Sequence, residues 1–335
     1  MHALAQAQPN IALVKYWGKR NSTLNLPAVG SLSVTLESLW TRTRVELDPA
    51  LRTDELTLDG RAARQREIDR VSALLERLRR LAGSAVHARV ESANNFPTAA
   101  GLASSASGFA ALAVAGSGAY GLALPPAELS RIARESSGSA ARSIFGGFVE
   151  MEAGSADDGH DALARPLLDA SAWPLAVLIA ITSTREKEVG STDGMTHTAQ
   201  TSPYYQAWVA GSPVELQAAR SAVLARDFDA LAVVSERSCL RMHALASSAD
   251  PGLIYWNGAT VEALHTVRAL RRGGTPCFFT VDAGPQVKVV CLPSATGRVA
   301  ATLREVPGVV EVMQSTLGQG ARLIAAEHAP ARVSA

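Results

Sequence analysis

The sequence predicts a two-layer α+β fold. The chain has 335 residues, 47% of them hydrophobic, which is enough apolar material for a substantial core in two domains or one large one. Segments with the period-two alternation of half-buried strands lie between segments with the three-to-four-residue period of amphipathic helices. They do not follow a regular βαβ repeat, which disfavours a doubly wound sheet.

The first half is predicted to begin with strands. The clearest helix covers residues 64–82, where apolar residues such as Leu74, Leu75 and Leu78 recur at helical spacing and Gly83 follows as a stop. In chain order we expect an apolar strand near 10–14, strands at 31–36, 43–47 and 54–60, the helix 64–82, a strand at 86–92, an Ala-rich helix to about 121, a helix at 126–135, a strand at 148–151, an acidic loop at 153–161 and a strand at 174–181.

The second half is predicted to be more helical. Two strands close it, joined by the turn Ala283-Gly284-Pro285. A boundary between the halves is expected near 182/183, and residues 328–335 are expected to be a frayed tail. The expected elements are helices at 202–209, 213–225, 228–247 and 259–273 and strands at 277–282 and 287–292.

Composition excludes several classes of protein. Lys and Arg number 32 and Asp and Glu 31, so the formal charge of +1 disfavours a nucleic-acid partner. Cys239, Cys277 and Cys291 form no disulfide framework and are interpreted as reduced core residues. The start of the chain does not resemble a signal peptide, and no run of ~20 apolar residues predicts a membrane span. A cytoplasmic location without membrane partners is therefore expected.

Two apparent motifs are not interpreted as sites. Residues 116–121 match G-x-G-x-x-G, but they end a helix rather than open one after a strand, so packing and helix termination explain them better. The pair Gly18-Lys19 lacks the remainder of a Walker A sequence. The seven histidines show no metal-ligating spacing, and no protein metal site is expected.

The Ser/Ala/Gly run from Pro97 to Gly108 is the strongest chemical signal. Gly101 permits close approach of a ligand to the backbone, and Ser104, Ser105 and Ser107 supply hydroxyls at the start of a helix. The free N–H groups and the dipole of such a helix end favour phosphate oxygens. A Ser-capped, closely packed helix without a ligand is the structural alternative.

Three further segments carry charged groups. Lys15, Lys19 and Arg20 follow an apolar strand and could neutralise a polyphosphate, or they could be solvated. Arg142 lies in a Gly/Ser segment and could clamp a carboxylate, or it could be exposed on a loop. Asp282 ends a strand, where it could be a catalytic carboxylate held ionised by a cation, or a turn cap.

Together these segments resemble the GHMP kinase superfamily, and more narrowly the diphosphomevalonate decarboxylase family. The run P-T-A-A-G-L-A-S-S-A (97–106) is similar to the phosphate loop of the superfamily. The narrower family is indicated by N-I-A-x-x-K-Y-W-G-K-R (10–20), S-G-S-A-x-R-S-x-F-G-G (137–147) and V-D-A-G-P (281–285), in the family's order. The resemblance spans residues 10–290. Gly190, in the stretch 189–194 that is interpreted as a loop, stands where the family commonly has Ser.

The resemblance implies a GHMP-kinase-like fold. Its N-terminal ATP-binding domain, 1–182, would resemble domain 2 of ribosomal protein S5, and a C-terminal α/β domain of GHMP type would cover 183–327. It also implies ATP-dependent decarboxylation of (R)-5-diphosphomevalonate to isopentenyl diphosphate, ADP, phosphate and CO2, with Mg2+ on the ATP phosphates. This is a step of the mevalonate pathway of isoprenoid and lipid biosynthesis. The family often forms homodimers, so a homodimer is expected.

The resemblance also implies residue roles. Asp282 would orient or deprotonate the 3-hydroxyl beside Lys15, and Arg142 would bind the substrate carboxylate. The other residues expected to bind substrate are Ala12, Tyr16, Trp17, Gly18, Lys19, Arg70, Ser137, Gly138, Ser139, Ser191 and Thr192. Those expected to bind the nucleotide are Pro97, Ala100, Gly101, Leu102, Ser104, Ser105 and Ser107.

Three alternatives remain open at this point. A phosphomevalonate decarboxylase would share the chemistry but accept one phosphate, and a mevalonate 3-kinase would transfer phosphate without releasing CO2. A non-catalytic nucleotide-binding homologue would not need Asp282, Lys15 and Arg142, all of which are present.

Overall fold

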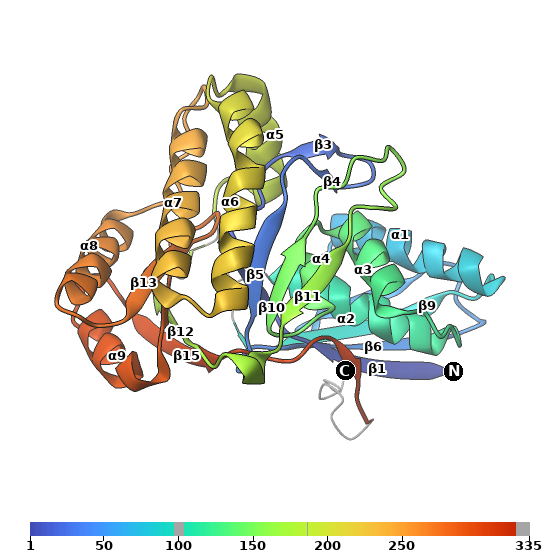
Figure 1. The fold of residues 1–335 in the computed structure, drawn as a ribbon. Helices are drawn as coiled ribbons and strands as arrows, with labels where there is room; N and C mark the ends of the chain where they lie inside the picture. Colours follow the sequence, from blue (N-terminus) through green and yellow to red (C-terminus); the bar gives the residue numbers. More distant parts are fainter. Residues whose placement is uncertain (97–103, 186, 326–335) are drawn as a thin grey trace.

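The computed structural model describes residues 1–96, 104–185 and 187–325. Elements from the first half of the chain, blue to green, lie beside those of the second half, yellow to red (Figure 1). Helices and sheets form separate layers rather than alternating βαβ units, so the predicted α+β class is confirmed.

A six-stranded sheet and four helices make up most of the first half. The strand order is β16-β1-β6-β9-β7-β8, with β7 and β9 parallel and the other pairs antiparallel. The strands are β1 (His2–Ala7), β6 (Thr41–Leu47), β7 (Glu55–Leu58), β8 (Arg61–Ala62), β9 (Ala88–Asn94) and β16 (Arg322–Leu323). The helices are α1 (Gln65–Ala82), α2 (Ser104–Ala119), α3 (Pro126–Ser136) and α4 (Ala140–Ser143).

Helices α1 and α2 form for different reasons. Helix α1 buries the predicted apolar stripe, the Glu67 carboxylate accepts the Arg64 N–H at its start, and Gly83 ends it in the left-handed region (φ 59°). Helix α2 is apolar around its whole circumference and buried on most sides. A Cβ at Gly116 would lie 2.6 Å from a Leu78 methyl, which confirms the packing interpretation of the glycine motif.

A central antiparallel sheet has the order β11-β10-β5-β2. Every residue of β5 is buried, so its polar Ser31 and Ser33 face a covered site rather than water. The Arg142 guanidinium donates to both hydroxyls. The strands are β2 (Asn10–Val14), β5 (Ser31–Thr35), β10 (Phe148–Met151) and β11 (Ala164–Leu168), and a small hairpin of β3 (Lys19–Asn21) and β4 (Leu26–Pro27) lies beside them.

A third, antiparallel sheet organises the second half, in the order β13-β14-β12-β15. One face of β12 packs Leu178 against α8 and α9, and the other packs Ile179 among residues of α6 and α7. Strand β12 precedes position 182 and is hydrogen-bonded on both sides to later strands. The elements are β12 (Ala176–Ile181), β13 (Cys277–Val281), β14 (Val287–Cys291), β15 (Glu311–Thr316), α5 (Ser191–Thr201), α6 (Tyr205–Ala225), α7 (Phe228–Ser247), α8 (Gly258–Arg272) and α9 (Thr296–Arg304), with short 3-10 turns at Ala170–Ala172 and Pro293–Ala295.

Two predictions of local structure are wrong. Helices at 202–209 and 213–225 are one helix, α6, that continues through Pro213, because burial of Trp208 and Ala219 outweighs the local preference of proline. The stretch 189–194, interpreted as a loop, contains the start of α5 at Ser191. Ten further elements were not predicted: strands β1, β3, β4, β8, β11, β15 and β16 and helices α4, α5 and α9.

Some predictions concern what the chain lacks. Cys239, Cys277 and Cys291 are free and buried, as expected of reduced core residues. Within the described residues, no helix is long and apolar enough to cross a membrane. In the same part of the chain, no cluster of three or more His, Cys, Asp or Glu residues could hold a metal ion.

Candidate active site

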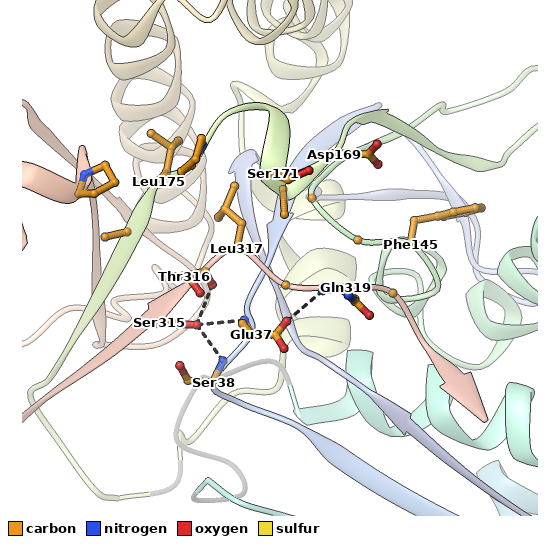
Figure 2. Close-up of a pocket in the computed structure, with 18 of the residues that line it drawn as sticks. Glu37, Ser38, Phe145, Asp169, Ser171, Leu175, Ser315, Thr316, Leu317 and Gln319 are labelled. Carbon is orange, nitrogen blue, oxygen red and sulfur yellow. Dashed lines mark hydrogen bonds between the residues drawn. The ribbon is translucent and has the colours of Figure 1, made fainter. Parts of the chain in front are cut away.

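One cavity, of about 980 Å3, lies beside the α4–β10 connection and strand β15 (Figure 2). The charged side chains among its described lining residues are Glu37 and Asp169, both acidic. Ser315 Oγ accepts the N–H groups of Glu37 and Ser38, each at 3.0 Å, and the Glu37 carboxylate accepts the N–H of Gln319 at 3.1 Å. These polar groups bond to one another, and the acidic lining does not suit an anionic ligand.

A second cavity, of about 700 Å3, matches the predicted site. It is enclosed by residues 15–19 after β2, the start of α2, the α3–α4 turn, residues 187–195 and the end of β13. Three acidic side chains in its described lining face six basic ones, which makes it suitable for a polyanion. The acidic residues are Glu188, Asp193 and Asp282, and the basic ones are Lys15, Lys19, Arg66, Arg70, Arg142 and Lys187.

Asp282, directly after β13, is held between two lysines. Lys15 Nζ lies 2.7 Å from Oδ1 and Lys288 Nζ lies 3.3 Å from Oδ2. Burial raises the pKa of the Asp282 carboxyl, but the two ammonium groups lower it more, and the net result is a pKa well below the ordinary range. Asp282 is therefore ionised at neutral pH. Its side chain is 26% exposed while Lys15 is 1% exposed, so neither residue is the solvated group or simple turn cap of the alternative interpretations.

Arg142, on the short helix α4, is 2% exposed and lines the same cavity. Its Nη1 donates to Ser31 Oγ (2.6 Å), and its Nε contacts Ser33 Oγ (3.1 Å) and Asn10 Oδ1 (3.2 Å). No carboxylate forms an ion pair with it among the described residues. Burial lowers its pKa to about 10. A buried guanidinium with only neutral partners is well suited to bind an anionic ligand.

Tyr16 and Gly138 meet on the cavity wall. The Tyr16 hydroxyl is buried and forms no hydrogen bond with the described part of the chain. Burial raises the pKa of Tyr16 above its ordinary value, so the hydroxyl stays protonated and can donate. A Cβ at Gly138 would collide with this hydroxyl, so Gly138 leaves the space that Tyr16 occupies. Ser137 and Ser139 flank this position and place their hydroxyls 3.4 Å apart.

The start of α2 lies next to the α3–α4 turn. Ser105 Oγ is 3.4 Å from Ser137 Oγ, and Arg70 donates to the Ser136 carbonyl at 3.0 Å. Burial and, secondarily, the nearby Arg70 lower the pKa of Lys19. Two cations thus lie close together in the same wall.

A smaller apolar cavity, of about 180 Å3, adjoins this wall. It shares Arg70, Ser104 and Ser105 with the main cavity and extends toward Phe109 and Leu58. The helix N-terminus therefore separates a basic cavity from an apolar one.

Most of the residues predicted for the site line the main cavity. These are Ala12, Lys15, Tyr16, Trp17, Lys19, Arg70, Ser104, Ser105, Ser137, Gly138, Ser139, Arg142, Ser191, Thr192 and Asp282. Pro97, Ala100, Gly101 and Leu102 lie outside the described residues.

Two predicted site residues do not line it. Ser107 is fully buried and its hydroxyl lies 2.6 Å from that of Thr41, so it packs α2 against β6 rather than facing a phosphate. Gly18 has φ 104°, and a Cβ there would collide with the Tyr205 hydroxyl, so its contribution is backbone shape.

Three basic residues were not predicted for the site: Arg66 and Lys187, which line the cavity, and Lys288, which contacts Asp282 without lining the cavity. Lys187 donates to Ser191 Oγ (2.9 Å) and to the Ala283 carbonyl (3.0 Å). Its position next to a Gly/Ser-rich segment was one available signal. For Lys288 the signal was a single lysine in the apolar strand predicted at 287–292.

The fold and this cavity define an enzyme of the GHMP kinase class, with a basic pocket at a helix N-terminus. A model described as the diphosphomevalonate decarboxylase-like N-terminal domain matches residues 7–164, and the mevalonate 5-diphosphate decarboxylase C-terminal domain matches 177–330. The chain is 39% identical to the diphosphomevalonate decarboxylase of Aspergillus fumigatus over 91% of its own length and 80% of that protein. The chain belongs to the diphosphomevalonate decarboxylase family.

Solved structures agree. The mevalonate diphosphate decarboxylase of Staphylococcus aureus is 36% identical with a TM-score of 0.91, covering 97% of this chain and 98% of that one. The enzyme from Enterococcus faecalis is 38% identical with a TM-score of 0.88, covering 97% and 99%. A structure of MDDEF, 39% identical with a TM-score of 0.89, is a complex with MVAPP, AMPPCP and magnesium, covering 97% and 99%.

Proposed function

We propose that the protein catalyses the ATP-dependent decarboxylation of (R)-5-diphosphomevalonate to isopentenyl diphosphate, ADP, phosphate and CO2. The observation that carries the proposal is that ionised Asp282 and the buried guanidinium of Arg142 face one basic cavity. The Asp282 carboxylate suits a hydroxyl group and the Arg142 guanidinium suits a carboxylate. The surrounding cations suit a diphosphate. All three functional groups occur together in this substrate.

The chemistry proceeds in two stages. The 3-hydroxyl oxygen attacks the γ-phosphorus of ATP and ADP leaves. The hydroxyl proton, made acidic by the forming O–P bond, passes by way of the Asp282 carboxylate to water. The C3–O bond then breaks with release of phosphate, and the electron pair of the C1–C2 bond forms the C2=C3 double bond as CO2 departs. A tertiary hydroxyl is crowded and weakly nucleophilic, so positioning and charge neutralisation must supply most of the rate enhancement.

Asp282 orients the 3-hydroxyl in this proposal and accepts its hydrogen bond. The two lysines keep the carboxylate ionised, which makes it a good acceptor but a weak base. Arg142 binds the C1 carboxylate. It holds that group while the C1–C2 bond breaks. The negative charge of the carboxylate ends on the departing phosphate, and CO2 leaves as a neutral molecule.

The diphosphate is proposed to bind the wall formed by Tyr16, Lys19, Arg70 and Ser139. Tyr16 offers an unpartnered hydroxyl, and Lys19 and Arg70 offer two neighbouring cations. The proposed lining further includes Ala12, Trp17, Gly138 and Ser137, with Ser191 and Thr192 at the phosphoryl-transfer end and Gly18 shaping the backbone.

ATP is proposed to place its phosphates at the start of α2, at Ser104 and Ser105 and the run 97–102. The small apolar cavity on the other side of Ser105 suits the base. Mg2+ fits as a phosphate-bound ion, because the described residues hold no cluster of three ligands while Glu188 and Asp193 offer carboxylates to its water shell. The bound ion neutralises phosphate charge.

The test is one assay on three substrates. Purified protein with ATP and Mg2+ is given mevalonate, its 5-phosphate and its 5-diphosphate, and ADP and CO2 are measured. We expect equal amounts of ADP and CO2 from the diphosphate. ADP without CO2 would identify a mevalonate 3-kinase, and turnover of the monophosphate alone would identify a phosphomevalonate decarboxylase.

We also propose a homodimer in the cytoplasm, with structural domains divided near 182/183. Family resemblance supports the dimer, and the three free, buried cysteines suit a reducing compartment. Sedimentation analysis of the purified chain tests the first part and limited proteolysis tests the boundary.

A further inference from the structure

Lys288 is buried where a charge is costly. It lies in the middle of β14 and is 1% exposed, between Val287 and Val289, which are fully buried. Among the described residues it does not line the substrate cavity. An ammonium group in such a strand is strongly unfavourable unless a counter-charge is present.

The counter-charge is the carboxylate of Asp282. Lys288 stands opposite Thr280 in the β13–β14 register, two residues before Asp282, and its Nζ lies 3.3 Å from Asp282 Oδ2. Lys15 reaches the other oxygen, Oδ1, at 2.7 Å from a different element. Lys15 is itself fixed by a 2.9 Å hydrogen bond to the Ala12 carbonyl, which also accepts from Thr280 at 3.1 Å.

This two-sided arrangement restricts the carboxylate. With one ammonium on each oxygen, rotation about the Cβ–Cγ bond of Asp282 would break one or both contacts. A carboxylate has about four lone-pair sites, so acceptor positions remain for a ligand on the exposed side. Lys15 faces the cavity and can respond to a bound ligand, whereas Lys288 lies behind the carboxylate.

We infer that Lys288 is a positioning residue that holds Asp282 from behind the cavity, so that its free lone pair points at the 3-hydroxyl. The inference deepens the proposed function and rests on the role proposed there for Asp282. Lys288 touches no substrate in this arrangement. Its loss should therefore slow the chemical step without weakening substrate binding.

Other nearby groups do not replace it. His243 on α7 donates to the Val281 carbonyl at 3.1 Å, and burial lowers its pKa to about 3, so it is neutral. Arg142 and Lys187 approach Asp282 from the cavity side, where they serve the ligand.

The kinetic test uses Lys288→Met, which keeps an unbranched side chain one atom shorter and removes the charge. We expect kcat to fall roughly 10- to 100-fold, the effect of a misplaced reacting group. The KM values for diphosphomevalonate and ATP should stay within about twofold. Lys288→Arg should recover part of the lost kcat. Lys288→Gln keeps an uncharged N–H donor group, so its kcat should lie between those of Lys288→Met and Lys288→Arg.

The matched control is Val290→Ala, at the next position on the same face of β14. It should lower Tm while kcat stays near that of the unaltered protein. A kcat within twofold for Lys288→Met would overturn the inference. So would an equal loss of kcat in Val290→Ala, or a rise of KM in place of the fall in kcat.

A second measurement separates this inference from the proposed function. If the unaltered protein releases no ADP and CO2 from any of the three substrates, the proposed function fails. The pairing of Lys288 with Asp282 is still tested by the Tm values of Lys288→Met, Asp282→Asn and the double variant. We expect the fall in Tm of the double variant to be smaller than the sum of the two single falls in Tm. Additive falls in Tm would refute the pairing.

Discussion

Replacing Arg142 by Met should weaken substrate binding while it leaves the stability of the ligand-free protein nearly unchanged. In the ligand-free protein, burial lowers the Arg142 pKa from 12.5 to about 10, so retaining the charge costs about 3 kcal/mol. Its three hydrogen bonds, to Ser31, Ser33 and Asn10, offset this by about 1 kcal/mol each. The two effects nearly cancel, and Arg142→Met should shift the Tm of the ligand-free protein by only a few degrees.

With substrate the balance changes. The carboxylate of diphosphomevalonate would lose a buried, charge-assisted partner, a truncation that costs about 2–5 kcal/mol. The expected fall in kcat/KM is therefore roughly 30- to 5,000-fold. The rise in Tm that diphosphomevalonate causes in the unaltered protein should largely disappear.

The assay combines thermal unfolding, with and without diphosphomevalonate, with the kinetics of ADP and CO2 release. The matched control is Arg134→Met. Arg134 is fully buried too, but it donates to the carbonyls of Gly159 (2.7 Å) and Ala162 (2.8 Å) and does not line the cavity. The Arg134→Met substitution should lower Tm and leave the KM for diphosphomevalonate unchanged. An Arg142→Met protein that keeps its substrate-dependent Tm shift and its KM would refute the assigned role.

Three further predictions concern turnover, the shape of the cavity wall and the pH dependence of stability. Asp282→Ala should keep the fold and ATP binding but lose roughly 1,000-fold or more in kcat, measured by ADP release. Gly138→Ala should displace the Tyr16 hydroxyl and raise the KM for diphosphomevalonate about tenfold. His243 has a folded pKa of about 3, so between its ordinary pKa of 6.5 and 3 only the unfolded chain takes up this proton. Its contribution to stability is complete above pH 6.5 and is lost as pH falls, by up to about 1.4 kcal/mol per pH unit. Between pH 7 and pH 5, the free energy of unfolding measured with urea should fall less for His243→Gln than for the unaltered protein.

Each of these has an outcome that contradicts it. Near-normal turnover in Asp282→Ala would end its proposed role. For Gly138→Ala the control is Gly211→Ala in α6, where a Cβ meets nothing within 4 Å. That variant should gain about 0.5–1 kcal/mol at unchanged KM. An equal KM change in both glycine variants would exclude the steric explanation. An unchanged pH dependence in His243→Gln would mean that other groups cause it.

The sequence by itself determined the elements whose pattern is local. Helix α1 has its apolar stripe and its glycine stop in adjacent residues, and strand β10 was predicted at its observed bounds. The charged groups at 15, 142 and 282 stand in short motifs of unusual composition, so the sequence alone indicates them as candidate site residues.

Only the tertiary structure decided which of these residues act together, because residues 15, 142, 282 and 288 come from four different places in the fold: the end of β2, helix α4, the end of β13 and strand β14. It removed Ser107 from the site, since the turn of α2 aims that hydroxyl at Thr41. It added Lys288, since β14 carries that side chain to the back of Asp282. The physical reason is that burial and charge pairing are properties of the assembled core, and no local pattern of residues encodes them.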